Sequence, residues 1–408
     1  MKVLIISKNE ISYNPRLLKA ADFFSDQNCS VTIFNPLTGL ASKEIYNSTI
    51  IGKNWEVIEN DIRKDKLTNS FNWLYVSVTH KILFLVYKVF KSGYVFERLY
   101  NKGLIGNKIS LRTKYDYVYI NLVDNLPFAA KIKKRTRCKI IYDSQEYFVG
   151  QYKKYDKDSF DWVVKSERLF IKDVDILLAP TDVMKERLVA DYKLSIPCFR
   201  VRNLPSKRML SATIPAKLDP QFTYLVWHGM SIYLDNARGV HLLIQALAKS
   251  TSNVKLVLQG VINNRQKAIL NNYISKLQLE GKIILMPPAD PYSIVPSLRH
   301  YDIGVIGEIP EEDNQKLTSS NKLFDYINAG LAVIVPDLVG LTETVIHYKS
   351  GLIYEPGNTH ALALCIDKLA NNRQMLSDLK TNAVEVSAKE LSWEHDFSPV
   401  WDCMVQKK

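Results

Sequence analysis

Residues 319–334 read SSNKLFDYINAGLAVI and combine two elements. The first is an amphipathic helix that Ser320 or Asn321 can cap, and the second is a short apolar strand. Free N–H groups at the start of such a helix favour an anion, and Lys322 adds positive charge there. Asp325 follows one helical turn later, where its carboxylate can bind two vicinal hydroxyls of the same ligand. A capped helix that only packs on a sheet is the simpler interpretation of these residues.

Short apolar runs alternate with longer amphipathic stretches over nearly the whole chain. Continuous apolar strands separated by helix-length segments are typical of parallel sheets covered on both faces. The predicted strands are 3–7, 31–35, 117–121, 139–142, 176–180, 199–203, 224–229, 254–260, 283–286, 303–306, 332–336 and 352–354. Their two successive series predict an α/β chain of two doubly wound, Rossmann-like domains. Prolines cluster where the series meet, so we expect the first domain over residues 1–205 and the second over 206–385.

The composition is that of a globular protein with its own cores. The 408 residues are 47% apolar and 24% charged, which excludes a disordered or collagen-like chain. The five cysteines are far apart and form no CxxC pair, so we expect neither a disulfide framework nor a cysteine-built zinc site. The first apolar run has the length of a strand and is too short for a signal peptide. We therefore expect a cytoplasmic protein.

The net charge of +12 is unevenly distributed, because residues 1–200 carry +11 of it. Between residues 73 and 114, eight basic residues are accompanied by one acidic residue. The apolar run within this segment is too short to span a bilayer. Two interpretations stay open. One is an amphipathic helix in the interface of an anionic membrane, with Lys81, Lys88 and Lys91 beside its apolar face. The other is a helix packed on the first sheet with an exposed lysine edge.

Polar side chains follow three predicted strands of the first half, at the edge where doubly wound folds bind ligands. Asn14 is expected to cap the helix after the first strand, and Arg16 then lies where a charged or hydroxylated substrate would pass. Asp124 and Glu146 follow two later strands and suit binding of sugar hydroxyls or general-base catalysis. For Asp143 we prefer a role as a helix cap.

In the second half, Gly229 closes a predicted strand and Arg238 opens the next helix. A glycine after a strand lets a ligand approach the backbone, and an arginine at a helix start can bind phosphate with two N–H groups. The pair indicates a diphosphate site, although it is neither a Walker loop nor a dinucleotide glycine loop. His228, beside the glycine, is expected to be structural.

These motifs together resemble the glycosyl transferase group 1 domain of family 4 GT-B glycosyltransferases. The block from Asn321 to Val333 is the most specific part of the resemblance. Weaker elements follow in the family's order: Gly229, Arg238-Gly239, Gly260, Gly351-Leu352 and Ser392-Trp393-Glu394 in the second half, and Asn14-Pro15-Arg16, residues 142–146 and Val174-Asp175 in the first. The resemblance implies the GT-B fold, two Rossmann-like domains facing a cleft, with a C-terminal helical segment (386–408) crossing back to the first domain.

The resemblance also implies roles for individual residues. The donor, a nucleotide diphosphate sugar, would be bound by Gly229, Arg238, Pro288, Asn321, Lys322 and Asp325. The acceptor side would consist of Arg16, Asp124 and Glu146. The catalytic residues would be Asp124, Glu146, Arg238 and Lys322. The reaction would retain the anomeric configuration and need neither a metal ion nor another cofactor.

Two positions depart from the family pattern. The family commonly has two glutamates eight positions apart; here the second is Asp325 and the first is Leu317. The first glutamate usually steadies the transferred sugar, so this change bears on the choice of donor. The acidic residues 311–313 could replace it only in a reshaped loop. Gln145 replaces the histidine of an amino-terminal Asp-x-His-Glu pattern, which removes one candidate general base.

The implied function is transfer of a sugar to a saccharide or lipid-linked acceptor in bacterial-type cell-surface polysaccharide or glycoconjugate synthesis, at the inner face of the membrane. The two departures keep a second class open, a catalytically weak GT-B partner that binds nucleotide or membrane within a polysaccharide-assembly complex. A sugar-nucleotide epimerase of the same fold would need carboxylates and histidines that we do not find. Nucleic-acid binding is disfavoured because no RNA- or DNA-binding motif accompanies the charge.

Overall fold

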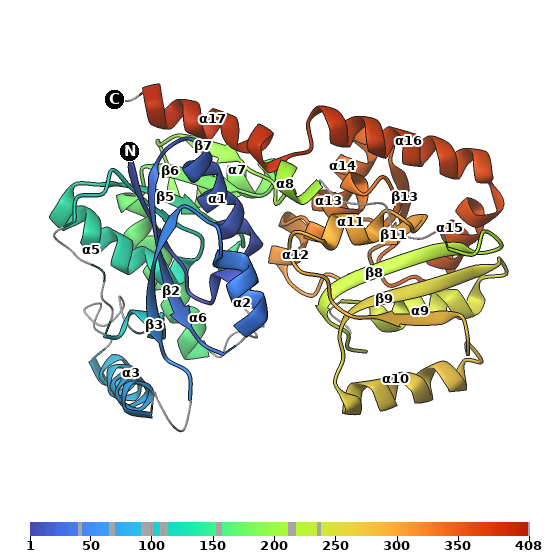
Figure 1. Ribbon diagram of the computed structural model, residues 1–408, viewed down its shortest axis with the longest axis horizontal. Helices are drawn as coiled ribbons and strands as arrows, with labels where there is room; N and C mark the ends of the chain where they lie inside the picture. The colour runs from blue at the N-terminus through green and yellow to red at the C-terminus, as the bar shows by residue number, and fades with distance from the viewer. Residues whose placement is uncertain are drawn as a thin grey trace. The chain divides into compact units, whose positions relative to one another are not determined.

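The computed structural model describes residues 1–39, 43–64, 70–90, 99, 101–106, 109, 113–151, 157–210, 218–234 and 238–406. The chain divides into two compact units, one of Met1–Val201 with Pro399–Lys408 and one of Arg202–Ser398. Each unit is built on its own parallel β-sheet with helices in the connections (Figure 1). The predicted α/β class with two doubly wound sheets is confirmed.

The first unit contains a seven-stranded sheet in the order β3-β2-β1-β4-β5-β6-β7. Its strands are β1 (Lys2–Ile6), β2 (Ser30–Leu37), β3 (Trp55–Asp61), β4 (Tyr117–Ile120), β5 (Lys139–Asp143), β6 (Ile176–Ala179) and β7 (Cys198–Arg200). The fully buried β1 pairs in parallel with β2 on one side and β4 on the other. The strand order therefore reverses direction at β1, and ligands of such sheets bind at the carboxyl ends beside this point.

Helices connect the strands of the first unit. They are α1 (Pro15–Asp26), α2 (Lys43–Ile50), α3 (Ser70–Phe90), α5 (Leu126–Thr136), α6 (Lys157–Phe170) and α7 (Asp182–Tyr192), with the short turns η1 (Ile11–Tyr13), η3 (Lys102–Leu104), η4 (Val123–Asn125), η5 (Phe148–Gly150) and η6 (Ile171–Asp173). Asn14 caps α1 as predicted, because its side chain accepts a hydrogen bond from the N–H of Leu17 and Pro15 follows at the first helical position.

The second unit contains a six-stranded sheet in the order β10-β9-β8-β11-β12-β13. Its strands are β8 (Thr223–Ser231), β9 (Val254–Val261), β10 (Ile283–Met286), β11 (Ile303–Val305), β12 (Ala332–Pro336) and β13 (Gly351–Tyr354). Its helices are α8 (Lys207–Leu210), α9 (Val240–Lys249), α10 (Asn264–Lys276), α11 (Ile294–Leu298), α12 (Asp313–Leu317), α13 (Asn321–Asn328), α14 (Val339–Tyr348), α15 (Thr359–Asn371) and α16 (Arg373–Lys389).

Both faces of the second sheet are buried, which is why its strands are continuous apolar runs. Leu225 and Trp227 of β8 pack with α9 and α15 on one face, whereas Val226 packs with α11 and α13 on the other. Successive side chains of a strand point to opposite faces, so the residues of a doubly covered strand are mostly apolar.

The last helix, α17 (Trp393–Gln406), runs from the second unit into the first. Its start belongs to the second unit, where Asp396 binds Arg202 through two hydrogen bonds of 2.7 and 2.8 Å. Its end belongs to the first unit, where the Tyr117 hydroxyl donates to the carbonyl of Met404 at 3.0 Å and Trp401 meets Phe23 edge to face. The expected return of the C-terminal helix to the first domain is confirmed.

Candidate active site

Four glycines crowd the carboxyl edge of the second sheet. A Cβ atom on Gly260 of β9 would lie 2.5 Å from the carbonyl oxygen of Gly229 in β8. Gly239, just before α9, has a φ of 67°, and a Cβ there would lie 1.6 Å from the carbonyl oxygen of Gly307, which follows β11. No side chain fits at these positions, so main chain from three strands forms this part of the edge. Glycine is needed at these positions because the main chains pack directly against one another.

The start of α13 faces the same edge without a side-chain cap. Ser320 occupies the N-cap position, but its hydroxyl makes no capping hydrogen bond and instead donates to Glu308 at 2.8 Å. The prediction of a helix start over Ser320 and Asn321 is confirmed, whereas hydroxyl capping by Ser320 is wrong. The N–H groups of Asn321 and Lys322 and the positive end of the helix dipole therefore remain available to an anion, whereas the N–H of Leu323 donates to the carbonyl of Ser320.

Glu308 lies beside the positive charges at this edge. No role for it was predicted from the sequence. Its carboxylate lies 2.9 Å from the ammonium of Lys322, which also lies 5.7 Å from the centre of the Trp227 ring. Burial raises the pKa of Glu308, but the charge and hydrogen bond of Lys322, the Ser320 hydroxyl and the charge of Arg238 together lower it below its ordinary value. Glu308 is therefore ionised, and Arg238 and Lys322 act on the same carboxylate. Its position just after β11, at the carboxyl edge, was the signal that could have revealed it.

Asp325 is fixed beside the end of β8. Its carboxylate lies 3.3 Å from Nε2 of His228, and the backbone N–H of His228 donates to the Tyr326 hydroxyl at 3.2 Å. The Tyr326 ring meets the His228 ring edge to face and occupies the space that a side chain at Gly304 would fill. Asp325 thus lies next to the strand end that carries Gly229, on the same helix as Lys322.

In the first unit, Asp124 is paired at the carboxyl ends of β1 and β4. Its carboxylate lies 2.6 Å from the ammonium of Lys8 and is almost fully buried, whereas the Lys8 side chain is about one-third exposed. Asn101 fixes the surrounding backbone, because its amide donates to the carbonyl of Ser7 and to Asn125. The geometry thus holds the Asp124 carboxylate in place at the strand ends, with the ammonium of Lys8 as its partner.

Arg16 and Asp143 form a buried ion pair. The guanidinium donates to both carboxylate oxygens at 2.6 and 2.7 Å and to the carbonyl of Val201 at 2.7 Å. The Tyr119 hydroxyl donates to the same carboxylate, and burial followed by the Asp143 charge raises the pKa of Tyr119 well above its ordinary value. The expected helix-capping role of Asp143 is wrong, because this residue ends β5 and no helix starts there. Arg16 is only 2% exposed and engaged in this pair, which favours a structural role over acceptor contact.

Glu146 is half-buried in the loop after β5. Its carboxylate accepts a hydrogen bond from the amide of Gln151 at 2.8 Å. The neighbouring amide nitrogen of Gln145 is buried and has no hydrogen-bond partner among the described residues. Among the predicted acceptor-side residues, Glu146 is thus a half-buried carboxylate that Gln151 holds in the loop after β5.

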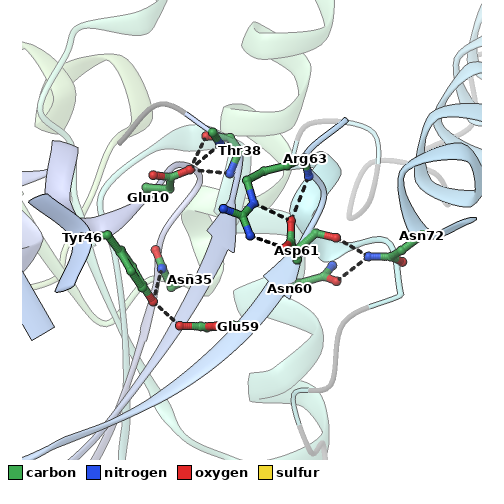
Figure 2. Close-up of polar contacts among 10 residues, drawn as sticks. Glu10, Asn35, Thr38, Tyr46, Glu59, Asn60, Asp61, Arg63 and Asn72 are labelled. Atoms are coloured by element: carbon green, nitrogen blue, oxygen red, sulfur yellow. Dashed lines mark hydrogen bonds and ion pairs between the residues drawn. The ribbon is translucent and has the colours of Figure 1, made fainter. Parts of the chain in front are cut away.

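Another carboxylate, that of Glu10, lies at the carboxyl ends of β1 and β2. Glu10 is buried and accepts hydrogen bonds from the N–H groups of Thr38 and Gly39, at 2.6 and 2.5 Å, and from the Thr38 hydroxyl (Figure 2). Hydrogen bonds from backbone N–H groups stabilise the charged form of a carboxylate. Glu10 thus orders this edge of the sheet.

Comparison with known proteins identifies the second unit. Residues 233–386 match the family model of glycosyl transferases group 1. These residues are a glycosyl transferases group 1 domain. No curated protein sequence matches the chain.

Solved structures match the whole chain. Alr3699/HepE of Anabaena, in complex with UDP and glucose, aligns with a TM-score of 0.67 at 15% identity and covers 100% of both chains. Sucrose-phosphate synthase of Thermosynechococcus elongatus aligns with a TM-score of 0.69 at 13% identity, over 100% of this chain and 99% of that one. The lipopolysaccharide outer core galactosyltransferase WaaB aligns with a TM-score of 0.60 at 15% identity over 100% of both chains. At these identities the likeness shows the GT-B fold, and the fold expectation is confirmed.

Two of the acidic residues before the α13 block serve the helix α12. Glu312 and Gln315 form a capping box at the start of α12, and Asp313 pairs with Lys316. These acids are thus committed to α12, and the carboxylate beside Lys322 comes from Glu308. Pro288 is exposed and follows the edge strand β10. No group of three or more candidate metal ligands occurs among the described residues.

Proposed function

We propose that this glycosyltransferase moves a sugar from a nucleotide diphosphate sugar to a saccharide or lipid-linked acceptor in the synthesis of a bacterial-type cell-surface polysaccharide or glycoconjugate. One observation carries the proposal: Arg238, Lys322 and the uncapped start of α13 converge on a glycine-lined strand edge. Cations and free N–H groups at a helix start are what a diphosphate requires. The complexes of HepE with UDP and glucose, and the name of WaaB, support the same donor class and pathway type.

Each donor-side residue has a distinct task in this proposal. Arg238 and Lys322 bind the diphosphate and stabilise the charge that grows as it leaves, and Asn321 and Gly229 offer backbone N–H groups and space. Asp325, fixed by His228, accepts hydrogen bonds from the ribose hydroxyls. Charge stabilisation of this kind lowers a barrier by about 3–4 kcal/mol per well-placed donor. Pro288 would border the base.

The reaction breaks the bond between the anomeric carbon and the diphosphate oxygen and forms a bond to the acceptor oxygen. The acceptor hydroxyl loses a proton, which passes to a carboxylate or to the departing diphosphate. Glu146 is our first choice for the carboxylate, since it is half-buried in the loop after β5, whereas the Asp124 carboxylate is almost fully buried against Lys8. We propose retention of the anomeric configuration without a metal ion, because Arg238 and Lys322 can supply the positive charge that a metal would otherwise provide.

Calorimetry with a panel of nucleoside diphosphates tests the donor site. We expect the wild-type protein to bind at least one ribonucleoside diphosphate and to bind its 2′-deoxy form less tightly, because the deoxy form lacks one partner of Asp325. UDP is the first probe, since HepE was solved with it. No binding to any nucleoside diphosphate would overturn the proposal.

A second candidate function is a catalytically weak partner that binds nucleotide or membrane within a polysaccharide-assembly complex. Leu317 and Gln145 favour it, because each replaces a residue that the family commonly uses. The two candidates differ in one measurable property, slow hydrolysis of the donor in the absence of acceptor. A chain that binds the nucleotide sugar but never hydrolyses it would favour the weak partner.

A further inference from the structure

The helix α3 exposes a continuous apolar stripe. Six apolar side chains of this stripe are between 46% and 70% exposed: Leu74, Tyr75, Val78, Ile82, Leu85 and Val89. Their spacing of three or four residues, with one adjacent pair, places them on one face of the helix. The expectation that this apolar segment is too short to span a bilayer is wrong, because Phe71–Phe90 is long and apolar enough to cross a membrane by length and composition, and its apolar window is only 11% buried. Continuous exposed apolar patches of this kind mark sites of contact with a protein or a membrane.

The opposite face of α3 holds the helix on the first unit. Asn72 donates to the carbonyl of Asp61 at the end of β3 (Figure 2), and the His80 ring lies 2.8 Å from the carbonyl of Leu99. Tyr87 is buried and meets Trp162 edge to face. Figure 1 shows α3 at the margin of the first unit. These contacts fix α3 on the first unit. The apolar stripe lies on the opposite face of the helix and points away from the core of the unit.

The charge of α3 is wholly positive. Its 21 residues include Lys81 and Lys88 and no aspartate or glutamate. At 100° per residue both lysines lie about a quarter turn from the centre of the apolar stripe, on one flank of it. Both are exposed, and the Lys88 ammonium lies 4.8 Å over the Phe84 ring. Lysines that flank an apolar face extend their stems along it and place their ammonium groups among anionic head groups.

We propose that this stripe docks the first unit on the surface of an anionic phospholipid bilayer, with α3 lying in the plane of the interface. Charge complementarity selects this occupant, because a second copy of the chain would bring the same lysines together without an acidic residue on α3. An in-plane helix also agrees with the fixed opposite face. A spanning helix would lose the Asn72 and His80 hydrogen bonds and place Lys81 near the middle of the bilayer.

The docking surface connects to the carboxyl edge of the first sheet. Asn60, beside Asn72, donates to the carbonyls of Gly103 and Ile105 around η3. Asn101, which precedes η3, donates to the carbonyl of Ser7 after β1. A lipid-borne acceptor would therefore meet this edge from the membrane side. The approach of a lipid-borne acceptor rests on the proposed function, whereas the docking of α3 on an anionic bilayer does not.

Flotation of the full-length protein with lipid vesicles tests the proposal. The vesicles contain phosphatidylcholine alone or phosphatidylcholine with phosphatidylglycerol, at low and high salt. The double variant Ile82→Glu/Leu85→Glu places two charges in the apolar stripe. The matched control is Ile346→Glu/Leu364→Glu, because Ile346 and Leu364 of the second unit are exposed to a similar degree as Ile82 and Leu85. Lys81→Gln/Lys88→Gln removes the charge and keeps the apolar stripe, so it tests the proposal even if the first variant does not fold.

We expect wild type and control to float with anionic vesicles at low salt. The Ile82/Leu85 variant should bind anionic vesicles at least tenfold less tightly than wild type. The lysine variant should bind them about 30-fold less tightly, because each of its two lysines contributes slightly more than fivefold. Activity on a soluble acceptor should survive in both, which separates failure of docking from failure of the proposed function. Equal binding by all variants or equal binding to neutral vesicles would overturn the proposal. So would a wild-type dimer that the Ile82/Leu85 variant converts to a monomer, or membrane retention after an alkaline wash.

Discussion

Arg238 is the residue whose charge the donor site should need most directly. It is exposed, precedes the strained Gly239 and acts on the same carboxylate as Lys322. Arg238→Ala should weaken nucleoside diphosphate binding by about 1.5–3 kcal/mol, the usual size of hydrogen bonds to a charged group. Calorimetry measures this directly. Arg265→Ala, an exposed arginine on α10, is the control, and equal affinities in wild type and Arg238→Ala would remove Arg238 from the site.

Glu308 should affect turnover by positioning Lys322. Glu308→Gln removes the charge that holds the ammonium at 2.9 Å, so Lys322 would meet the leaving diphosphate less well oriented. We expect kcat with the donor to fall about tenfold, or about 1.4 kcal/mol, with a smaller change in KM. Glu311→Gln, an exposed neighbour, should leave both constants unchanged. A large rise in KM with unchanged kcat would assign Glu308 to binding instead.

At the scale of elements, Glu167 joins three parts of the first unit. It lies on α6 and accepts hydrogen bonds from Tyr142 of β5 and Tyr192 of α7, at 2.8 and 2.6 Å. Burial raises the pKa of Glu167 from 4.5 to about 7, although both tyrosine hydrogen bonds oppose this. Between these pH values the folded state binds a proton that the unfolded state releases. The stability of the first unit should therefore fall as the pH rises through this window, by up to about 1.4 kcal/mol per pH unit.

Glu167→Gln should remove this pH dependence. Thermal unfolding of wild type, Glu167→Gln and the exposed-site control Glu186→Gln between pH 5 and 7 measures it. We expect wild type and Glu186→Gln to lose stability with rising pH in parallel, and Glu167→Gln to lose less. Parallel curves for all three proteins would show that Glu167 does not titrate in this window.

The elements show what the sequence could and could not predict. All twelve predicted strands form, because strands buried on both faces are continuous apolar runs. The strand β3 was missed, since Trp55–Asp61 carries three acids and pairs only with β2 at the sheet edge. Asp143 was misjudged because its partner Arg16 is 127 residues away, a distance at which local patterns carry no signal. Glu308 is only 14 residues from Lys322, and its position just after a predicted strand was a usable signal that the sequence analysis did not use.

At the scale of the whole molecule, the end of the chain completes the first unit. Met404 of α17 is fully buried there, whereas its neighbour Val405 is 38% exposed. Met404→Ala should destabilise the first unit by about 2–5 kcal/mol, the usual cost of removing a buried side chain of this size. Val405→Ala should cost less than about 0.5 kcal/mol. Denaturant unfolding followed by tryptophan fluorescence compares them, and equal midpoints would mean that α17 does not stabilise this unit.

The charge distribution also belongs to the whole molecule. Residues 1–200 carry nearly all of the net charge, and the second unit, which holds the proposed donor site, is almost neutral overall. The donor site must therefore attract a diphosphate through a few placed cations, whereas the first unit can respond to an extended anionic surface. This division suits a transferase that takes a soluble donor on one unit and a membrane-borne acceptor on the other.

Donor hydrolysis without acceptor tests the central claim most directly, that the second unit activates a nucleotide diphosphate sugar. Wild type, Lys322→Ala and the exposed-site control Lys267→Ala are incubated with UDP-, GDP- and ADP-linked sugars, and the released nucleoside diphosphate is measured. We predict that wild type and Lys267→Ala hydrolyse at least one donor slowly, and that Lys322→Ala is about 100-fold slower with it, a loss of about 2.7 kcal/mol. Hydrolysis of none of the donors by wild type, or an equal rate in Lys322→Ala, would contradict the account.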